Sequence, residues 1–121
     1  MGRAISAQLV ADGLEVHGFD IDASGLDRVS EDLGDAFRGH AIDLTQPIAI
    51  GELFRSIAAE TGGIDVLVNN AGTCLMGEFP RIEATELDRQ MSLNFSSAFH
   101  CCQAVVLAMQ GRPGVRKIVN I

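Results

Sequence analysis

Apolar residues recur along this chain with the spacing of a helix face in several segments. The strongest example is Ile50, Phe54 and Ile57, which lie three or four positions apart and follow Pro47, a residue suited to a first helical turn. A second is Leu26, Val29 and Leu33, closed by Gly34. Helices are predicted over residues 2–11, 24–33, 47–61 and 86–109, the last opened by Thr85 and Asp88 as a capping box.

Between these segments lie short apolar runs that predict strands. Ile64, Val66, Leu67 and Val68 follow two glycines, and their run lacks the alternation of a half-exposed strand. Such a run is typical of a strand buried on both faces of a parallel sheet. Strands are predicted over residues 14–20, 37–43, 64–68 and 117–121.

The alternation of helices and strands defines the expected fold class. Right-handed crossovers bring successive strands into one parallel sheet with helices on both faces. We therefore predict an α/β fold, a doubly wound parallel sheet of the Rossmann type, in a single domain spanning residues 1–121. The order is unusual because it begins with a helix and ends with a strand.

Charge and cysteine content exclude several other classes. The net charge is −7, and the nine basic residues form no stripe, so nucleic acid is not an expected partner. Cys74, Cys101 and Cys102 lack the spacing of a disulfide framework or a zinc site, and no metal is expected. No apolar run is long enough to cross a bilayer, and no apolar block follows Met1. A cytoplasmic protein without a membrane partner is the default expectation.

Polar and small residues stand where predicted strands end. Asn69-Asn70-Ala71-Gly72 follows one strand, Asp20 ends another, and Asp43-Leu44-Thr45 ends a third. In open α/β sheets, ligands bind beyond the carboxyl ends of the strands. Gly2 opens a predicted helix, where a phosphate can approach unpaired N–H groups.

These motifs resemble those of the short-chain dehydrogenase/reductases. Asn69-Asn70-Ala71-Gly72 is similar to the family's N-N-A-G motif, and Gly2 to the last glycine of its T-G-x-x-x-G-x-G fingerprint. Lys117 to Ile121 resembles the strand that leads to the family's catalytic Ser. The resemblance covers essentially the whole chain and implies hydride transfer between NAD(H) and an alcohol or ketone.

The resemblance also implies roles at the cofactor. Asp20 would accept hydrogen bonds from the adenosine ribose and disfavour a 2′-phosphate, so that NAD is preferred over NADP. Ile21 would lie beside the adenine. Asp43, followed by Leu44, would contact the adenine amino group, with helix capping before Pro47 an equal alternative. Asn70, Ala71 and Gly72 would lie against the ribose and nicotinamide, whereas Asn69 is expected to tie neighbouring strands together.

Asn94 is the one candidate catalytic residue. It lies inside a predicted apolar helix, where an Asn is intrinsically unfavourable and usually has a partner or a task. In the resembled family an Asn at this place holds a water in a proton relay with Ser, Tyr and Lys. A hydrogen bond to the backbone of the neighbouring strand is the alternative, and both are compatible.

The sequence also departs from the family. It contains no Tyr, so the Y-x-x-x-K pair is absent, and the first strand with most of its phosphate loop is missing. In the family's strand order that first strand is central, which leaves the strands at Leu14 and Ile64 without a shared neighbour. We therefore expect residues 1–121 to be an inactive part of a longer enzyme.

Two further expectations concern partners and competing functions. The family pairs its long helix across a dimer axis, so a homo-oligomer through residues 86–109 is expected, with core packing as the alternative for its apolar seam. A catalytically silent dinucleotide-binding or regulatory protein on the same scaffold is the competing function. A flavodoxin-like module is a third alternative, and it predicts no ribose contact for Asp20.

Overall fold

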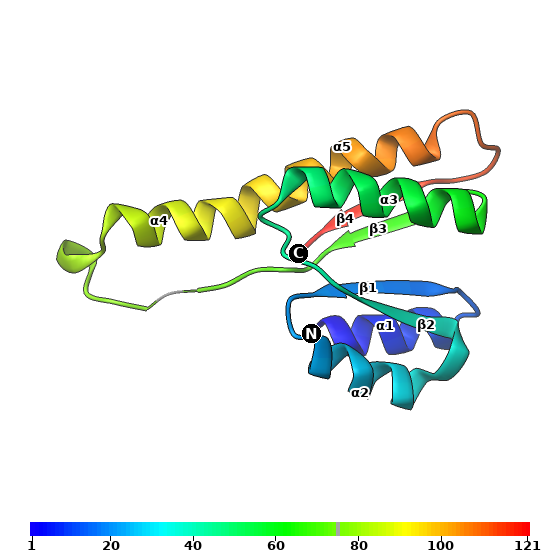
Figure 1. The fold of residues 1–121 in the computed structure, drawn as a ribbon, viewed down its shortest axis with the longest axis horizontal. Coiled ribbons are helices and arrows are strands. Elements are labelled where there is room, and N and C mark those ends of the chain that lie inside the picture. The colour runs from blue at the N-terminus through cyan, green and yellow to red at the C-terminus, as the bar shows by residue number, and fades with distance from the viewer. Residues whose placement is uncertain (75) are drawn as a thin grey trace. The chain divides into compact units, whose positions relative to one another are not determined.

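The structure is a computed structural model that describes residues 1–74 and 76–121. The chain divides into two compact units, Met1–Asp43 and Leu44–Ile121, and each is described by itself. Parallel strands with intervening helices occur in both units (Figure 1), so the predicted α/β class is confirmed. The expectation of a single domain stays a prediction.

The first unit contains one parallel strand pair and two helices. In chain order its elements are α1 (Gly2–Ala11), β1 (Val16–Asp20), α2 (Ala23–Leu33), the short 3-10 turn η1 (Gly34–Ala36) and β2 (Phe37–Ala41). The strands pair in register from Val16 opposite Phe37 to Asp20 opposite Ala41. The predicted strand 37–43 is therefore two residues too long, and Asp43 lies beyond its end.

Small residues allow close packing around these strands. A Cβ atom at Gly39 would lie 2.7 Å from the Cβ of Leu26, so helix α2 packs directly against β2 at this glycine. A Cβ atom at Gly18 would lie 2.4 Å from the Phe37 ring. Leu26 and Phe37 are the buried apolar residues between α2 and the β1–β2 pair. Any larger side chain at either glycine would displace one of them.

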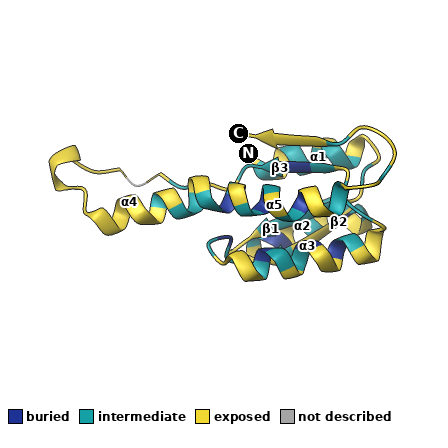
Figure 2. Ribbon diagram, turned by 90° about the horizontal axis from the view of Figure 1, so that it is seen from above, coloured by how far each residue is buried: buried dark blue, intermediate teal, exposed yellow. Residues whose placement is uncertain are grey.

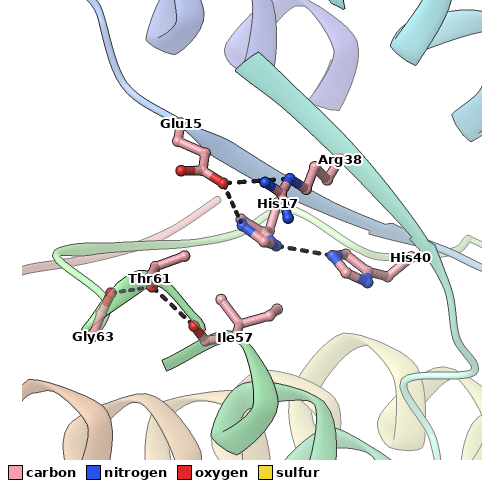
Figure 3. Close-up of polar contacts among 7 residues, drawn as sticks. All are labelled: Glu15, His17, Arg38, His40, Ile57, Thr61 and Gly63. Carbon is pink, nitrogen blue, oxygen red and sulfur yellow. Dashed lines mark hydrogen bonds and ion pairs between the residues drawn. The ribbon is translucent and has the colours of Figure 1, made fainter. Parts of the chain in front are cut away.

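A polar cluster that the sequence analysis did not predict lies on β1 and β2 (Figure 3). The rings of His17 and His40 are stacked, with centroids 5.1 Å apart, and His17 Nδ1 lies 2.9 Å from His40 Nε2. Glu15 Oε1 lies 3.3 Å from His17 Nε2 and 3.5 Å from Arg38 Nε. The register places His17 opposite Arg38 and Phe19 opposite His40, and Glu15 directly precedes β1. The pairing thus brings the histidines together although 23 positions separate them.

The second unit contains the other parallel strand pair. Its elements are α3 (Pro47–Thr61), β3 (Val66–Asn69), the 3-10 turn η2 (Phe79–Arg81), α4 (Ala84–Met91), the π-helical turn η3 (Ser92–Ser96), α5 (Ser97–Met109) and β4 (Lys117–Asn120). Strands β3 and β4 pair from Val66 opposite Lys117 to Asn69 opposite Asn120. Strands β1 and β3 belong to separate two-stranded sheets, as expected.

The core of the second unit lies largely between two helices. Helices α3 and α5 run side by side (Figure 1), and α5 also contacts β3. Helix α3 buries Ile50, Phe54 and Ile57, as its spacing predicted. It ends where Thr61 donates from Oγ1 to the Ile57 and Gly63 carbonyls (Figure 3). Gly62 then adopts a left-handed φ of +77°, which suits glycine.

The predicted helix over residues 86–109 is interrupted. Helix α4 begins at Ala84, and its capping box consists of Glu83 and Glu86. The predicted box of Thr85 and Asp88 is wrong because the chain enters the helix two residues earlier, where the Glu86 carboxylate can accept the Glu83 N–H. The π-helical turn η3 then separates α4 from α5.

The apolar seam predicted along this helix is mostly exposed. Five of its residues are exposed to between 44% and 63%: Leu87, Met91, Phe95, Phe99 and Val106. Cys102 and Met109 are half-buried. The buried face of α5 is instead formed by Ser97, Cys101 and Val105 (Figure 2). The π turn inserts an extra residue, which rotates the faces of α5 relative to α4. Seam residues are exposed on both sides of this turn.

Across the described residues no helix is long and apolar enough to span a membrane.

Candidate functional site

Asn69, the last residue of β3, ties the two strands of its sheet together. Its Nδ2 donates to Asn120 Oδ1 at 2.8 Å, and it lies 3.4 Å from Cys102 Sγ on helix α5. Asn120 is the residue directly opposite Asn69 in the register. The predicted role of Asn69 in tying neighbouring strands together is confirmed. The bend that follows is therefore anchored to the β3–β4 sheet.

The next residue, Asn70, carries an unused acceptor. Its Oδ1 is buried and has no hydrogen-bond partner among the described residues. A buried amide oxygen without a partner is unfavourable by about 1–3 kcal/mol, so such atoms usually serve a ligand or a water. The position is the carboxyl end of a parallel strand, where ligands bind in open α/β folds.

Asn94 holds the bend after β3 through two hydrogen bonds. Its Oδ1 accepts the Thr73 backbone N–H at 2.7 Å, and its Nδ2 donates to the Thr73 carbonyl at 2.8 Å. Gly72 makes this approach possible, because a Cβ atom there would lie 3.2 Å from Asn94 Oδ1. The bonds reach the loop after the strand rather than the strand itself. Asn70, Gly72 and Asn94 are therefore gathered around one bend, with Ala71 exposed between them.

Asp20 ends strand β1 with an exposed carboxylate. Its Oδ1 accepts the Asp22 backbone N–H at 3.0 Å, and Oδ2 has no hydrogen-bond partner in the described part of the chain. Ile21 is 75% exposed. The Ser24 hydroxyl, which donates to Asp22 Oδ1 at 2.7 Å, and the Gly25 N–H lower the pKa of Asp22. Two acidic residues, Asp20 and Asp22, therefore lie at this strand end.

Asp43 and Leu44 follow β2. Asp43 is half-buried at the end of the first unit, whereas Leu44 is buried at the start of the second. The N-cap of α3 is Gln46, whose side chain makes no capping hydrogen bond. Asp43 is therefore not the N-cap of α3, because that helix begins four residues later, at Pro47, and its N-cap is Gln46. An adenine contact for Asp43 and Leu44 stays a prediction.

Gly2 is the first residue of α1, as predicted. The N–H groups of Ala4 and Ile5 point back to the Met1 carbonyl, and no side chain of Met1 caps this end. The first turn carries no acidic residue. This end is therefore compatible with an anion, since no carboxylate already satisfies its positive dipole.

The Cys101 thiol lies in the core and not in the site. Burial, reinforced by Cys102, raises the pKa of Cys101 to about 11, so this thiol is neutral and inert at ordinary pH. No group of three His, Cys, Asp or Glu side chains within residues 1–74 and 76–121 is arranged to hold a metal ion.

Sequence reasoning missed two residues that support the site. Thr73 accepts and donates through its backbone, which carries no signal in residue type. Ser97 is 3% exposed and donates to the Leu93 carbonyl at 2.5 Å. A signal for Ser97 was present in its spacing, because it follows Asn94 by three positions in a helix that is otherwise apolar at this face.

Parallel strand pairs with helices between them, and polar side chains at the carboxyl ends of strands, define a Rossmann-type α/β protein. A family model described as short chain dehydrogenase matches residues 1–121, so the chain belongs to the short-chain dehydrogenase/reductase family. The family resemblance is thereby confirmed, and the flavodoxin-like alternative is overturned.

Curated relatives and solved structures agree with this assignment. The chain is 36% identical over 109 residues to the 3-oxoacyl-(acyl-carrier-protein) reductase FabG of Salmonella typhimurium, covering 90% of this chain and 45% of the relative. It is 31% identical over 108 residues to the D-threitol dehydrogenase of Mycolicibacterium smegmatis, covering 87% and 42%. A short-chain dehydrogenase/reductase structure from Burkholderia xenovorans superposes with a TM-score of 0.91 at 29% identity, covering 98% of this chain and 48% of that one. The chain thus spans about half the length of these proteins.

Proposed function

We propose that these residues belong to an oxidoreductase that transfers hydride between NAD(H) and an alcohol or ketone. The observation that carries the proposal is the buried, unpartnered Oδ1 of Asn70 beside the bend held by Asn94. An amide oxygen in that position accepts a hydrogen bond from a hydroxyl or amide of a ligand. The relatives named above, a 3-oxoacyl reductase and a D-threitol dehydrogenase, support the substrate class of alcohols and ketones.

Residues in each unit are suited to bind one part of a nicotinamide dinucleotide. Asp20 has a carboxylate oxygen available for ribose hydroxyls, and the N-terminus of α1 at Gly2 suits a phosphate. Ile21, Asp43 and Leu44 are proposed as adenine contacts. Asn70, Ala71 and Gly72 are proposed to meet the ribose and nicotinamide. When bound, the nicotinamide ring would supply or accept the hydride at its C4 atom.

Asn94 is proposed to act chiefly as a positioning residue. Both polar atoms of its side chain bind the Thr73 backbone, which fixes the bend that follows Gly72. One Nδ2 hydrogen is left after the bond to the Thr73 carbonyl, and it can donate to a water. The structural and relay interpretations of Asn94 are therefore compatible, as the sequence analysis allowed.

Charge supports NAD rather than NADP as the cofactor. Nine of the sixteen acids but only three of the nine bases lie in residues 1–43. Asp20 and Asp22 stand together at the end of β1, where a 2′-phosphate on the ribose would bring further negative charge. The Arg28 guanidinium lies 3.7 Å from Asp22 Oδ2 and offsets the charge of Asp22. Repulsion of a 2′-phosphate is therefore expected chiefly from Asp20.

The cofactor proposal is tested by titrating the full polypeptide that carries residues 1–121 with NADH and with NADPH. Asp20→Ser should weaken NADH binding about ten-fold, the effect of losing one or two hydrogen bonds to a carboxylate. The same substitution should improve NADPH binding because a repulsive charge is removed. Asp27→Ser, which alters an exposed acid on α2, serves as the control. Equal affinities of the wild type and Asp20→Ser for both nucleotides would exclude a ribose contact.

A catalytically silent dinucleotide-binding protein is the second candidate function. Residues 1–121 hold the proposed nucleotide contacts, and both candidate functions require such contacts. Binding of NADH without oxidation in the presence of 3-oxoacyl or polyol substrates would favour the silent protein. Turnover by the same polypeptide would favour the enzyme.

We also propose a homo-oligomer through helices α4 and α5. The exposed seam, from Leu87 to Val106, presents apolar side chains along one stretch of helix. Contiguous apolar surface of this kind marks interaction sites on soluble proteins. A second copy of the same helix offers the complementary surface that a two-fold axis requires.

A further inference from the structure

The π-helical turn η3 lies beside the bend that carries the proposed nicotinamide contacts. At its end the Ser97 N–H donates to the Ser92 carbonyl, five residues back, instead of to Leu93, four residues back as in an α-helix. The Ser97 hydroxyl donates to that Leu93 carbonyl at 2.5 Å. The Ser97 hydroxyl therefore binds the Leu93 carbonyl, which the Ser97 N–H would bind in a regular α-helix.

The placement of Ser97 makes this bond more than a surface contact. Ser97 is the buried polar residue of the described core, 3% exposed, on the face of α5 that also buries Cys101 and Val105. Asn94 lies within the same turn, three positions earlier, and its side chain reaches the Thr73 backbone. A π turn changes the direction in which the residues on either side of it point, and such turns are frequent at functional sites.

We propose that Ser97 is a positioning residue that stabilises the π turn and thereby aims the Asn94 amide at Thr73. The inference rests on the proposed function, in which the Gly72–Thr73 bend meets the nicotinamide side of the cofactor. Ser97 itself touches neither substrate nor cofactor in this scheme. Its effect on the reaction passes through Asn94 and the backbone of Thr73.

Ser30 provides a matched control. Its hydroxyl donates to the Leu26 carbonyl four residues back at 3.0 Å, in the regular helix α2 and with no π turn. Ser30→Ala and Ser97→Ala therefore remove the same kind of bond. If each Ser only satisfies a carbonyl, both substitutions should affect helix stability alone. If Ser97 also positions Asn94, only Ser97→Ala should change the contact at Thr73.

The test follows amide hydrogen exchange at Thr73 in the full polypeptide without cofactor. Ser97→Ala should speed exchange of the Thr73 amide about ten-fold, the loss expected for one hydrogen bond, and Ser30→Ala should leave it unchanged. Ser97→Thr should restore protection because it retains a hydroxyl. In an Asn94→Ala background, Ser97→Ala should add nothing further. Equal exchange at Thr73 in wild type and Ser97→Ala, or full additivity with Asn94→Ala, would overturn the proposal.

A second variant, Ser97→Cys, and a turnover assay complement the exchange measurement. If Ser97→Ala does not fold, Ser97→Cys keeps nearly the same volume with a much weaker donor, and it should show the same direction of change at Thr73. In turnover assays, Ser97→Ala should lower kcat about ten-fold with little change in the substrate KM. An absence of nucleotide binding in the wild type would sink the proposed function, but the exchange result at Thr73 would still decide the role of Ser97.

Discussion

Helix α3 and the helical stretch α4–α5 carry similar apolar patterns, but the apolar residues are buried on α3 and exposed on α4–α5. On α3, Ile50, Phe54 and Ile57 are nearly inaccessible to solvent, as the spacing predicts. On α4–α5, a comparable stripe is exposed, and α5 buries the neighbouring face instead (Figure 2). The comparison shows that spacing identifies an apolar face, whereas the packing partner decides whether that face is core or an interaction surface.

The largest difference between the two stripes should appear in the free energy of unfolding. Phe54→Ala removes a buried ring and should cost about 3–5 kcal/mol. Phe99→Ala removes a ring that is half exposed and should cost less than about 1 kcal/mol in the monomer. Urea denaturation of both variants, at a protein concentration low enough to favour monomers, measures the difference. Similar losses for the two would mean that the seam is core after all.

A sharper version of the comparison uses adjacent residues on α5. Val105 is fully buried, and Val106 is 44% exposed. Val105→Ala removes two buried methyl groups and should cost about 2 kcal/mol, whereas Val106→Ala should cost less than about 0.5 kcal/mol. The same denaturation experiment applies. The reverse order would show that the π turn does not rotate α5 as described.

The exposed stripe should control association. Replacing both Met91 and Phe99 by Glu places charge on the proposed surface between two copies, and it should raise the dissociation constant of the oligomer at least about ten-fold. Analytical ultracentrifugation measures the change. Glu52→Lys on α3 is the control, because it alters charge away from the seam. An oligomer unaffected by the double substitution would place the interface elsewhere.

The smallest effect concerns the buried side of α5 and its pH dependence. The pKa of Cys101 is raised from an ordinary 9.0 to about 11 because burial disfavours the thiolate. Its contribution to stability is therefore fully present below pH 9 and is lost as the pH rises towards 11. Wild type should lose more stability than Cys101→Ala across this window. Iodoacetamide at pH 8 should label exposed Cys74 first, and early labelling of Cys101 would contradict its burial.

The ends of β1 and β3 also differ in how much of their chemistry the sequence predicted. Asp20 and Asn70 both follow strands that their apolar runs predicted. The exposed carboxylate of Asp20 was expected of a residue at the end of a strand. The unpartnered oxygen of Asn70 was not predictable, because it depends on which groups from other elements reach that atom. The same holds for the Glu15, His17, Arg38 and His40 cluster, which only the β1–β2 register assembles.

The sequence by itself determined the order of elements, the parallel α/β class, the family and the strand tie made by Asn69. These follow from short-range spacing, from glycine and proline at turns, and from motifs that are contiguous in the chain. It also indicated that Asn94 has a partner, since an Asn inside an apolar helix rarely lacks one.

Only the tertiary structure decided the remaining features. The π turn at Ser92–Ser96 cannot be predicted from the spacing of apolar residues. The apolar pattern continues through the turn, so the extra residue leaves no visible break in it. The predicted seam is mostly exposed, Ser97 is buried in the core, and the Asn94 side chain binds the Thr73 backbone. Each of these depends on contacts between segments far apart in sequence, where packing and hydrogen-bond geometry override local propensity.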